Sequence, residues 1–500
     1  MTKMDLNGAS KQIGLACIAI IWLTGFCFGQ PKVTLGPKVG PPTTNVLVSG
    51  SGLPADDAVD IYFDTADLAL AATNSTGAFS KIPIPVPASA VPGTHYVTVV
   101  VRSSGEAVQT TFLVQTNWVE VGFTPKGKRS NPYENVLSPS TVGAIDLQWS
   151  YTTGSYVESS PAVANGVVYV GSDDGNIYAL NATTGAILWA YASGEVDSSP
   201  TVANGVVYFG SDDTNVYALN AKSGALLWSY TTGSLVFSSP AVANGVVYVG
   251  SYDGKVYALN ATTGAKLWSY TTGSWVYSSP AVANGVVYVG SVDNNVYALN
   301  ATTGTKLWSY TTGSAVYSSP AVANGVVYVG SFDDNVYALN AKSGALLWSY
   351  TTGSLVFSSP AVANGVVYVG SVDNNVYALN ARTGAKLWSY TTGNYVESSP
   401  AVANGVVYVG SHDTNVYALN AKSGALLWSY TTGSLVFSSP AVANGVVYVG
   451  SFDDNVYSFD QQGGELARTT RQRPDPKTLH PDFNLKPSQP VTKLTRNDSD

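Results

Sequence analysis

Few residues in this chain are of the types that perform chemistry, and their spacing keeps them apart. The three histidines, His95, His412 and His480, are separated by long stretches of sequence. Both cysteines, Cys17 and Cys27, fall within the first 29 residues. Nucleophilic catalysis and metal binding need several such side chains grouped around one point. We therefore expect no catalytic residues, no cofactor and no resident metal.

One short segment could bind calcium through oxygen ligands. It is the turn SDDGN, from Ser172 to Asn176, in which two carboxylates stand side by side. An aspartate recurs at the equivalent turn of every later repeat, and Asp is common in turns because its side chain bonds nearby backbone. A structural turn is therefore the favoured interpretation, with weak calcium binding as the alternative.

The composition favours a β-rich chain with a substantial core. Only 11% of the residues are charged, against a usual ~25%. Apolar residues make up 45% of the chain, which excludes wholesale disorder. The net charge of -8 argues against a nucleic-acid partner, because such binding depends on Lys and Arg neutralising phosphates.

The first 29 residues have the pattern of an export signal. Lys3 and Lys11 precede an apolar run from Ile13 to Phe28, which ends at the small residue Gly29. This run is shorter than the ~20 residues that cross a bilayer, so cleavage after Gly29 is expected, with an uncleaved anchor as the alternative. The protein is therefore expected to be secreted or periplasmic and to touch a membrane only through such an anchor. Cleavage would leave the mature chain without cysteine.

Residues 31–116 predict a small β-sandwich, because short alternating segments are separated by turn signals. Its opening, PKVTLGPKVGPPTTNVLVSGSGLP, resembles that of bacterial immunoglobulin-like modules. A lead-in segment, residues 117–144, is expected to link the sandwich to the larger C-terminal part of the chain. Residues 471–500, polar and rich in proline, predict a disordered tail. The expected strands of the sandwich are 45–48, 59–63, 94–101 and 110–114.

A unit of 40 residues repeats from Ile145 onward, with the core SSPAVANGVVYVGSxDxNVYALNAxxGxxLWSY. Each unit contains four strand-length pieces, and the first pair is joined by Asn-Gly, a strong hairpin signal. Four antiparallel strands per unit predict an eight-bladed β-propeller over residues 145–470. The repeat proline marks the eight copies at Pro161, Pro200, Pro240, Pro280, Pro320, Pro360, Pro400 and Pro440.

The phase of the repeat predicts how the ring closes. A tryptophan strand, with Trp149, precedes the first copy, whereas the last copy has Arg468 where a tryptophan is due. Residues 145–151 are therefore expected to supply the outer strand of the last blade. The alternative is that residues 464–469 pair there.

The segment from Ala179 to Trp189 and its six later copies resemble the docking motif AxDxxTGxxxW of quinoprotein alcohol dehydrogenase-like propellers. The resemblance implies that each indole packs against the Ala and Gly of a neighbouring motif. One departure is consistent, because the Asp of the motif is Asn in every complete copy, as at Asn181. The implied docking residues are Trp149, Trp189, Trp228, Trp268, Trp308, Trp348, Trp388 and Trp428.

The resemblance covers both enzymes and non-catalytic proteins. The quinone-dependent dehydrogenases of this fold hold pyrroloquinoline quinone with calcium, usually beneath a disulfide between adjacent cysteines, and build their site from long insertions. This chain has no cysteine beyond Cys27 and no insertion between repeats, and its copies are nearly identical. We therefore expect a member of the non-catalytic branch, an exported scaffold for protein or cell-envelope interactions. The alternative is a dehydrogenase dependent on pyrroloquinoline quinone.

Differences between the copies gather in two loops of each unit, the link between blades and the second-to-third-strand turn. Because strands alternate in direction, both loops should emerge on one face, called the variable face, opposite a constant face. Most acids of the repeats fall on the variable face, whereas Lys222 and Lys422 fall on the other. We expect a basic protein or cell-surface partner there, and loop drift is the alternative. The candidate interaction residues are Tyr156, Glu158, Asp173, Tyr252, Trp275, Tyr277, Phe332, Glu397 and His412.

Overall fold

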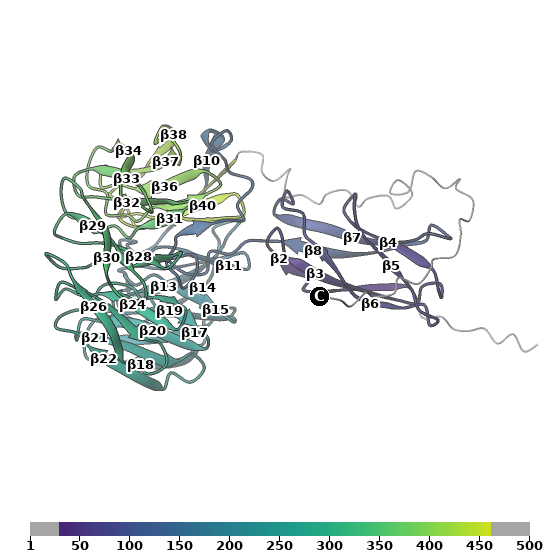
Figure 1. Ribbon diagram of the computed structural model, residues 1–500, viewed down its shortest axis with the longest axis horizontal. Helices are drawn as coiled ribbons and strands as arrows, with labels where there is room; N and C mark the ends of the chain where they lie inside the picture. Colours follow the sequence, from purple (N-terminus) through teal and green to yellow (C-terminus); the bar gives the residue numbers. More distant parts are fainter. Residues whose placement is uncertain (1–29, 462–500) are drawn as a thin grey trace, which may run out of the picture.

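The computed structural model describes residues 30–461, so the predicted export signal and the predicted tail lie outside the described residues. Within this range the regular structure is β-strand except for one turn of 3-10 helix, η1 (Val142–Ala144). Figure 1 shows two bodies, a pair of sheets formed by the N-terminal part and a ring of sheets formed by the repeats. No helix in residues 30–461 is long and apolar enough to cross a membrane. The prediction of an all-β propeller fold is confirmed.

The N-terminal body is a sandwich of two sheets with strand orders β1-β3-β6 and β2-β8-β7-β4-β5. Val46 from the first sheet shares one buried core with Ile61 and Phe112 from the second. The four expected strands are present, and the sequence analysis missed β1, β2, β5 and β6. The strands are β1 (Lys32–Gly36), β2 (Val39–Gly40), β3 (Asn45–Ser51), β4 (Ala58–Phe63), β5 (Ala66–Ala72), β6 (Phe79–Pro85), β7 (Gly93–Val101) and β8 (Ala107–Val114).

Each repeat forms one antiparallel sheet, here called a blade, and residues 30–461 contain eight of them. In blade 1 the order is β11-β12-β13-β14, from the ring centre outward. Asn165 and Gly166 join β11 to β12 with φ angles of 52° and 77°, the positive values that make Asn-Gly a hairpin signal. The same pair recurs in every blade.

The four strands of a blade have nearly constant lengths and positions from one blade to the next. The innermost strands are β11 (Ala162–Ala164), β15 (Thr201–Ala203), β19 (Ala241–Ala243), β23 (Ala281–Ala283), β27 (Ala321–Ala323), β31 (Ala361–Ala363), β35 (Ala401–Ala403) and β39 (Ala441–Ala443). The second strands are β12 (Val167–Gly171), β16 (Val206–Gly210), β20 (Val246–Ser251), β24 (Val286–Gly290), β28 (Val326–Gly330), β32 (Val366–Gly370), β36 (Val406–Gly410) and β40 (Val446–Gly450).

The outer half of each blade completes the sheet. The third strands are β13 (Asn176–Asn181), β17 (Asn215–Asn220), β21 (Lys255–Asn260), β25 (Asn295–Asn300), β29 (Asn335–Asn340), β33 (Asn375–Asn380), β37 (Asn415–Asn420) and β41 (Asn455–Gln461). The outermost strands are β14 (Ile187–Ala192), β18 (Leu226–Thr231), β22 (Lys266–Thr271), β26 (Lys306–Thr311), β30 (Leu346–Thr351), β34 (Lys386–Thr391), β38 (Leu426–Thr431) and, for blade 8, β10 (Ile145–Thr152).

Tryptophans join neighbouring blades near the outer edge of the ring. The indole Nε1 of Trp149 donates a hydrogen bond to the carbonyl of Ala182 at 3.1 Å, and a Cβ placed on Gly185 would lie 2.7 Å from the same ring. Six further tryptophans make the same two contacts with the next blade: Trp189, Trp228, Trp268, Trp308, Trp348 and Trp388. Trp428 differs, because Phe459 packs edge-on against it at 5.1 Å between ring centroids.

Strand β10 closes the ring. It pairs antiparallel with β41, from Ile145 opposite Gln461 to Thr152 opposite Asn455, as the phase of the repeat predicted. The alternative closing segment, residues 464–469, lies outside the described range. At the inner edge, Ser438 Oγ donates to the carbonyl of Ser159, and the same bond joins each earlier pair of neighbouring blades.

The lead-in segment does more than link the two bodies, because residues 118–131 run through the centre of the ring. The middle valine of six innermost strands donates its backbone N–H to a carbonyl of this segment, as Val163 does to Trp118 and Val402 does to Arg129. Residues 130–131 form strand β9 (Ser130–Asn131), which pairs parallel with β35. An innermost strand has a free edge whose N–H groups need acceptors, and the segment provides them. The expectation of a simple linker therefore missed the place of this segment in the ring.

Candidate functional site

The two variable loops of each unit lie together on one face of the ring. In blade 1 the backbone N–H of Asp173 donates to the carbonyl of Tyr156 at 3.0 Å, joining the turn to the link between blades. On the opposite face the N–H of Ala182 donates to the carbonyl of Gly166 at 2.9 Å, joining the two constant turns. The structure therefore has the variable and constant faces that the alternation of strands implies.

The candidate interaction residues lie at different depths on the variable face. Tyr156 and Trp275 are 49% and 50% exposed, and each stacks on a neighbouring ring, Phe452 and Tyr252 respectively, at 4.9 Å between centroids. The other seven are half-buried: Glu158, Asp173, Tyr252, Tyr277, Phe332, Glu397 and His412.

Tyr252, Tyr277 and Phe332 are therefore less exposed than Tyr156 and Trp275. Their rings pack on neighbouring rings instead of pointing into solvent. Phe332 stacks on Tyr317 at 4.4 Å, and Tyr277 meets Phe357 at 5.4 Å in an edge contact. The Tyr277 contact joins blades 4 and 6, so it could not be read from one repeat.

One position in each blade lines the axis of the ring on the variable face. It is the residue three places before the repeat proline, and the set is called the axial ring. Blades 1, 2 and 7 have a carboxylate at this position, and the other five blades have an aromatic residue. The axial ring consists of Glu158, Asp197, Phe237, Tyr277, Tyr317, Phe357, Glu397 and Phe437.

Tyr277 covers the centre of the axial ring. It contacts Phe237, Tyr317 and Phe357 at 5.4–5.7 Å between ring centroids, and thus reaches from blade 4 toward blade 6. Burial raises the pKa of the Tyr277 hydroxyl well above its usual value, and the charge of Glu158 raises it further. The hydroxyl therefore lies in the field of the carboxylates on the other side of the axis.

The carboxylates of blades 1, 2 and 7 crowd one side of the variable face. Burial first, and the charges of Asp173 and Glu397 second, raise the pKa of Glu158 to about 7. Burial and the charge of Glu158 raise the pKa of Asp197 to about 9. Burial and neighbouring acids raise the pKa of Asp212 to about 6. These acids therefore lack the cationic partners that would stabilise their charged form.

His412 is the one imidazole on the described part of the variable face. Its Nε2 lies 3.2 Å from Oε2 of Glu397, but without hydrogen-bond geometry. It faces the acidic side and lowers the pKa of Glu158 only as the last of several contributions.

The repeated turn aspartate is used by the fold. Oδ1 of Asp174 accepts the N–H of Asn176 at 2.9 Å, and its Oδ2 accepts the Tyr178 hydroxyl and the N–H of Gly154, each at 2.6 Å. This supports a structural turn over the calcium alternative for Ser172 to Asn176. In residues 30–461 no three His, Cys, Asp or Glu side chains come together as metal ligands.

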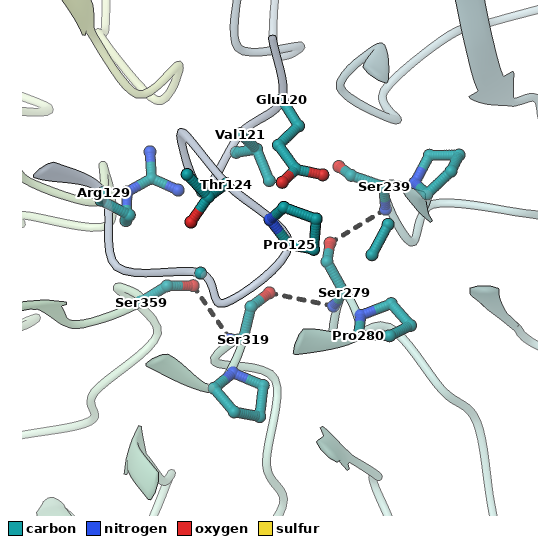
Figure 2. Close-up of a pocket in the computed structure, with 15 residues that line it drawn as sticks. Glu120, Val121, Thr124, Pro125, Arg129, Ser239, Ser279, Pro280, Ser319 and Ser359 are labelled. Carbon is teal, nitrogen blue, oxygen red and sulfur yellow. Dashed lines mark hydrogen bonds between the residues drawn. The ribbon is translucent and has the colours of Figure 1, made fainter. Parts of the chain in front are cut away.

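Below the axial ring the first residue before each proline forms a ring of serines. Each hydroxyl oxygen accepts the backbone N–H of its equivalent in the preceding blade, at 2.9–3.1 Å. Figure 2 shows part of this ring around Thr124 and Pro125 of the lead-in segment. The serine ring consists of Ser160, Ser199, Ser239, Ser279, Ser319, Ser359, Ser399 and Ser439.

A cavity of about 80 Å³, called the axial chamber, lies at the centre of the ring. Val121 and Arg129 of the lead-in segment form its floor, the serine ring its wall and the axial ring its roof. A second cavity, of about 20 Å³, lies between the lead-in segment and the innermost strands of blades 3–6 and also touches Glu120 and Arg129 (Figure 2).

Sequence reasoning missed two charged residues at this centre. Arg129 is 3% exposed; its Nε donates to the carbonyl of Pro400 at 3.1 Å, its Nη2 has no partner within residues 30–461, and burial lowers its pKa to about 9. Glu120 is also 3% exposed; its carboxylate accepts the N–H of Val242, and burial raises its pKa to about 8. The one signal in the sequence was Glu120 itself, a charged residue between the apolar residues Trp118 and Val121 in a segment outside the repeats.

Pyrroloquinoline quinone with calcium does not fit this centre. The axial chamber is smaller than the ~300 Å³ at which ordinary ligand pockets begin, and residues 118–131 fill the space beneath it. Residues 30–461 contain no cysteine for the disulfide that such enzymes usually place over the quinone. No reaction step is therefore derived through this cofactor.

Two family models match the chain. Residues 136–326 match the β-propeller of the β-alanine-activating enzyme. Residues 311–398 and 394–492 match the family of the outer membrane protein assembly factor BamB. The first match begins in the lead-in segment, the second extends past the repeats to residue 492, and neither reaches the N-terminal sandwich.

Individual relatives are similar over different shares of the chain. The quinohemoprotein alcohol dehydrogenase ADH-IIG of Pseudomonas putida is 34% identical over 77 residues, 15% of this chain and 11% of the relative. The chain therefore matches about a tenth of the length of such curated relatives. Among solved structures, BamB from Moraxella catarrhalis superposes with a TM-score of 0.55 at 20% identity, covering 63% of this chain and 99% of that one. The quinohemoprotein alcohol dehydrogenase of Comamonas testosteroni gives 0.61 at 16% identity, covering 76% and 83%. The structural likeness shows the fold alone.

Proposed function

We propose that this protein is an exported, non-enzymatic scaffold, because its repeats are those of the PQQ-like β-propellers, to which BamB and the quinoprotein alcohol dehydrogenases belong. In this proposal an immunoglobulin-like module precedes an eight-bladed ring, and the variable face binds a protein or cell-surface partner. The competing function is that of a dehydrogenase dependent on pyrroloquinoline quinone.

The observation that carries the proposal is the course of the lead-in segment through the ring. Residues 118–131 bond to the innermost strands and occupy the space in which a large cofactor would need room. A catalytic centre also needs different side chains in complementary roles around the substrate. The described repeats differ mainly at the variable face, and residues 30–461 bring no three His, Cys, Asp or Glu side chains together there as metal ligands.

The charge and chemistry of the variable face support a basic partner. Glu397 raises the pKa of Glu158, and Glu158 raises that of Asp197, so a cationic group placed among them would relieve this repulsion. Tyr156 and Trp275 are half-exposed and offer the aromatic area that anchors many interfaces. Similarity to the family of BamB, an outer membrane protein assembly factor, supports a place in the cell envelope.

A dye-reduction assay tests the enzymatic alternative. The purified protein is mixed with pyrroloquinoline quinone and calcium, and electron transfer from alcohols or aldose sugars to a dye is followed, with a quinone-free control. We expect no reduction above the control. Quinone-dependent reduction of the dye would overturn the proposal.

Site-specific cross-linking tests the face. A photo-reactive amino acid replaces Trp275 on the variable face in one variant and Lys222 on the constant face in a matched variant, and both are exposed to cell-envelope extract. We expect a discrete cross-linked product from position 275 that diminishes as salt rises, because exposed charges are screened beyond ~8 Å at physiological salt. A product from position 222 alone would contradict the proposed face.

A further inference from the structure

The axial chamber has a cationic end and an acidic end. At its floor stands Arg129 from the lead-in segment, and at its roof stand Glu158, Asp197 and Glu397 from blades 1, 2 and 7. Buried polar groups are normally paired in a protein, yet Nη2 of Arg129 has no partner within residues 30–461. The chamber therefore contains a cationic pole with a free donor and, opposite it, a pole of crowded acids.

The cationic pole is the guanidinium of Arg129. Only its Nε has an acceptor, the carbonyl of Pro400, whereas the buried Nη2 has no partner within the described residues. Burial is the sole cause that lowers the pKa of Arg129, so no carboxylate of residues 30–461 offsets the charge. A buried guanidinium in this state is a strong binding group for a carboxylate.

The serine ring adds donors to this pole. Each serine oxygen accepts a backbone N–H of the preceding blade, as Ser199 does from Ser160 at 2.9 Å. None of these hydroxyls donates to an acceptor within residues 30–461. Their O–H groups line the chamber around its whole circumference and are free to meet a ligand oxygen.

The anionic pole is formed by the roof carboxylates. The charge of Glu158 raises the pKa of Asp197, and His412, whose Nε2 lies 3.2 Å from Oε2 of Glu397, lowers the pKa of Glu158 only as the last of its causes. Tyr277 and Phe357 cover the same end with aromatic rings at 5.4 Å from each other. Carboxylates together with aromatic faces are the groups that bind ammonium and quaternary ammonium ions.

We propose that the axial chamber binds a small zwitterion, an α-amino acid of about the size of glycine, with its carboxylate at Arg129 and its ammonium group beneath Tyr277. A volume of about 80 Å³ has room for roughly five water-sized groups, which is the heavy-atom size of glycine. A ligand with only one charge would interact with one pole and leave the other unchanged. This inference shares Glu158, Asp197 and Glu397 with the proposed variable face, but its test with small probes does not depend on any partner.

Titration calorimetry of the full-length protein tests the inference with four probes. Glycine and alanine represent the zwitterions, acetate the carboxylate alone and tetramethylammonium the cation alone. We expect at least one zwitterion to bind at least tenfold more tightly than either half-ligand. Equal affinity for acetate, which would indicate an anion site only, or no heat with any zwitterion, which would indicate water alone, overturns the inference.

Variants locate the two poles. At the roof, Glu397→Gln should weaken zwitterion binding about tenfold or more while leaving acetate unaffected, and Glu195→Gln, an exposed acid that does not line the chamber, serves as the matched control. At the floor, Arg129→Gln should abolish the preference of zwitterion over tetramethylammonium. If Arg129→Gln fails to fold, the roof pair decides alone, and equal affinities of Glu397→Gln and Glu195→Gln would contradict the assigned site.

Discussion

The joints near the outer edge of the ring and the residues around its axis follow opposite rules. At the outer joints seven tryptophans make the same contacts, an indole hydrogen bond to an alanine carbonyl and close packing on a glycine. At the axis one position per blade differs, with a carboxylate in three blades and an aromatic side chain in the other five. Identical joints close the ring, and the few positions that differ distinguish its two faces and place carboxylate and aromatic side chains at its axis.

The lead-in segment sharpens this difference. It passes the innermost strands once, so each strand bonds to a different residue, such as Trp118 in blade 1 and Arg129 in blade 7. Eight nearly equal strands thereby acquire unequal surroundings. Asymmetry at the centre comes from the one segment that does not repeat.

The largest effect is expected for Glu120→Gln. The free energy of unfolding of this variant is compared with that of the unaltered protein over a range of pH. In the unfolded chain this carboxyl titrates near 4.5, and in the folded chain near 8, so the folded state holds an additional proton between these values. The contribution of Glu120 to the free energy of unfolding should therefore be highest below pH 4.5 and fall as pH rises to about 8, by on the order of 5 kcal/mol in total. Urea unfolding at several pH values measures this.

Glu120→Gln removes the titration but keeps an acceptor for the N–H of Val242. Its stability relative to the unaltered protein should therefore increase steadily from pH 4.5 to pH 8. A difference in the free energy of unfolding that stays constant over this range would mean that Glu120 is charged in the folded state. It would contradict the burial of this carboxyl at the axis of the ring.

The next effect concerns the closing joint. Trp149→Ala removes a buried indole where the ring is joined by strand pairing and not by continuous chain, and it should lower the free energy of unfolding by about 3–5 kcal/mol. Leu147→Ala, in the same strand but 38% exposed, is the matched control and should cost far less.

Deletion of residues 466–500 checks the same joint from the other end. Because β10 already pairs with β41 up to Gln461, this deletion should leave the free energy of unfolding nearly unchanged. A loss equal to that of Trp149→Ala would show that the closing strand is wrongly assigned.

A smaller loss of stability should distinguish the cost of a steric clash at an outer joint from the cost of backbone strain. Gly304 and Gly325 have φ angles of 73° and 78°, so an alanine is strained at both. A Cβ at Gly304 would lie 2.7 Å from the Trp268 ring, whereas none of the described atoms outside the chain neighbours lies within 4 Å of one at Gly325. Gly304→Ala should therefore be less stable than Gly325→Ala by about 1–3 kcal/mol, measured by urea unfolding. Equal losses would contradict the docking role of the tryptophan.

The sequence revealed those parts of the fold that repeat or that depend on neighbouring residues. The Asn165–Gly166 turn and the closing strand could be predicted from local signals and from the phase of the repeat. The depth of Tyr277 could not be read from the sequence, because contacts across the ring bury this side chain. Arg129 and Glu120 were missed because they occur once, in a segment whose path depends on the assembled ring.

The variable face is proposed as the working surface of the molecule, and the binding of an identified partner to two variants tests this claim most directly. Tyr156→Ala combined with Trp275→Ala removes the two exposed aromatic anchors, and Lys222→Ala combined with Lys422→Ala alters only the constant face. We expect the first variant to lose affinity about tenfold or more and the second to bind as the unaltered protein does. Loss of binding by the second variant, with the first unaffected, would contradict the claim.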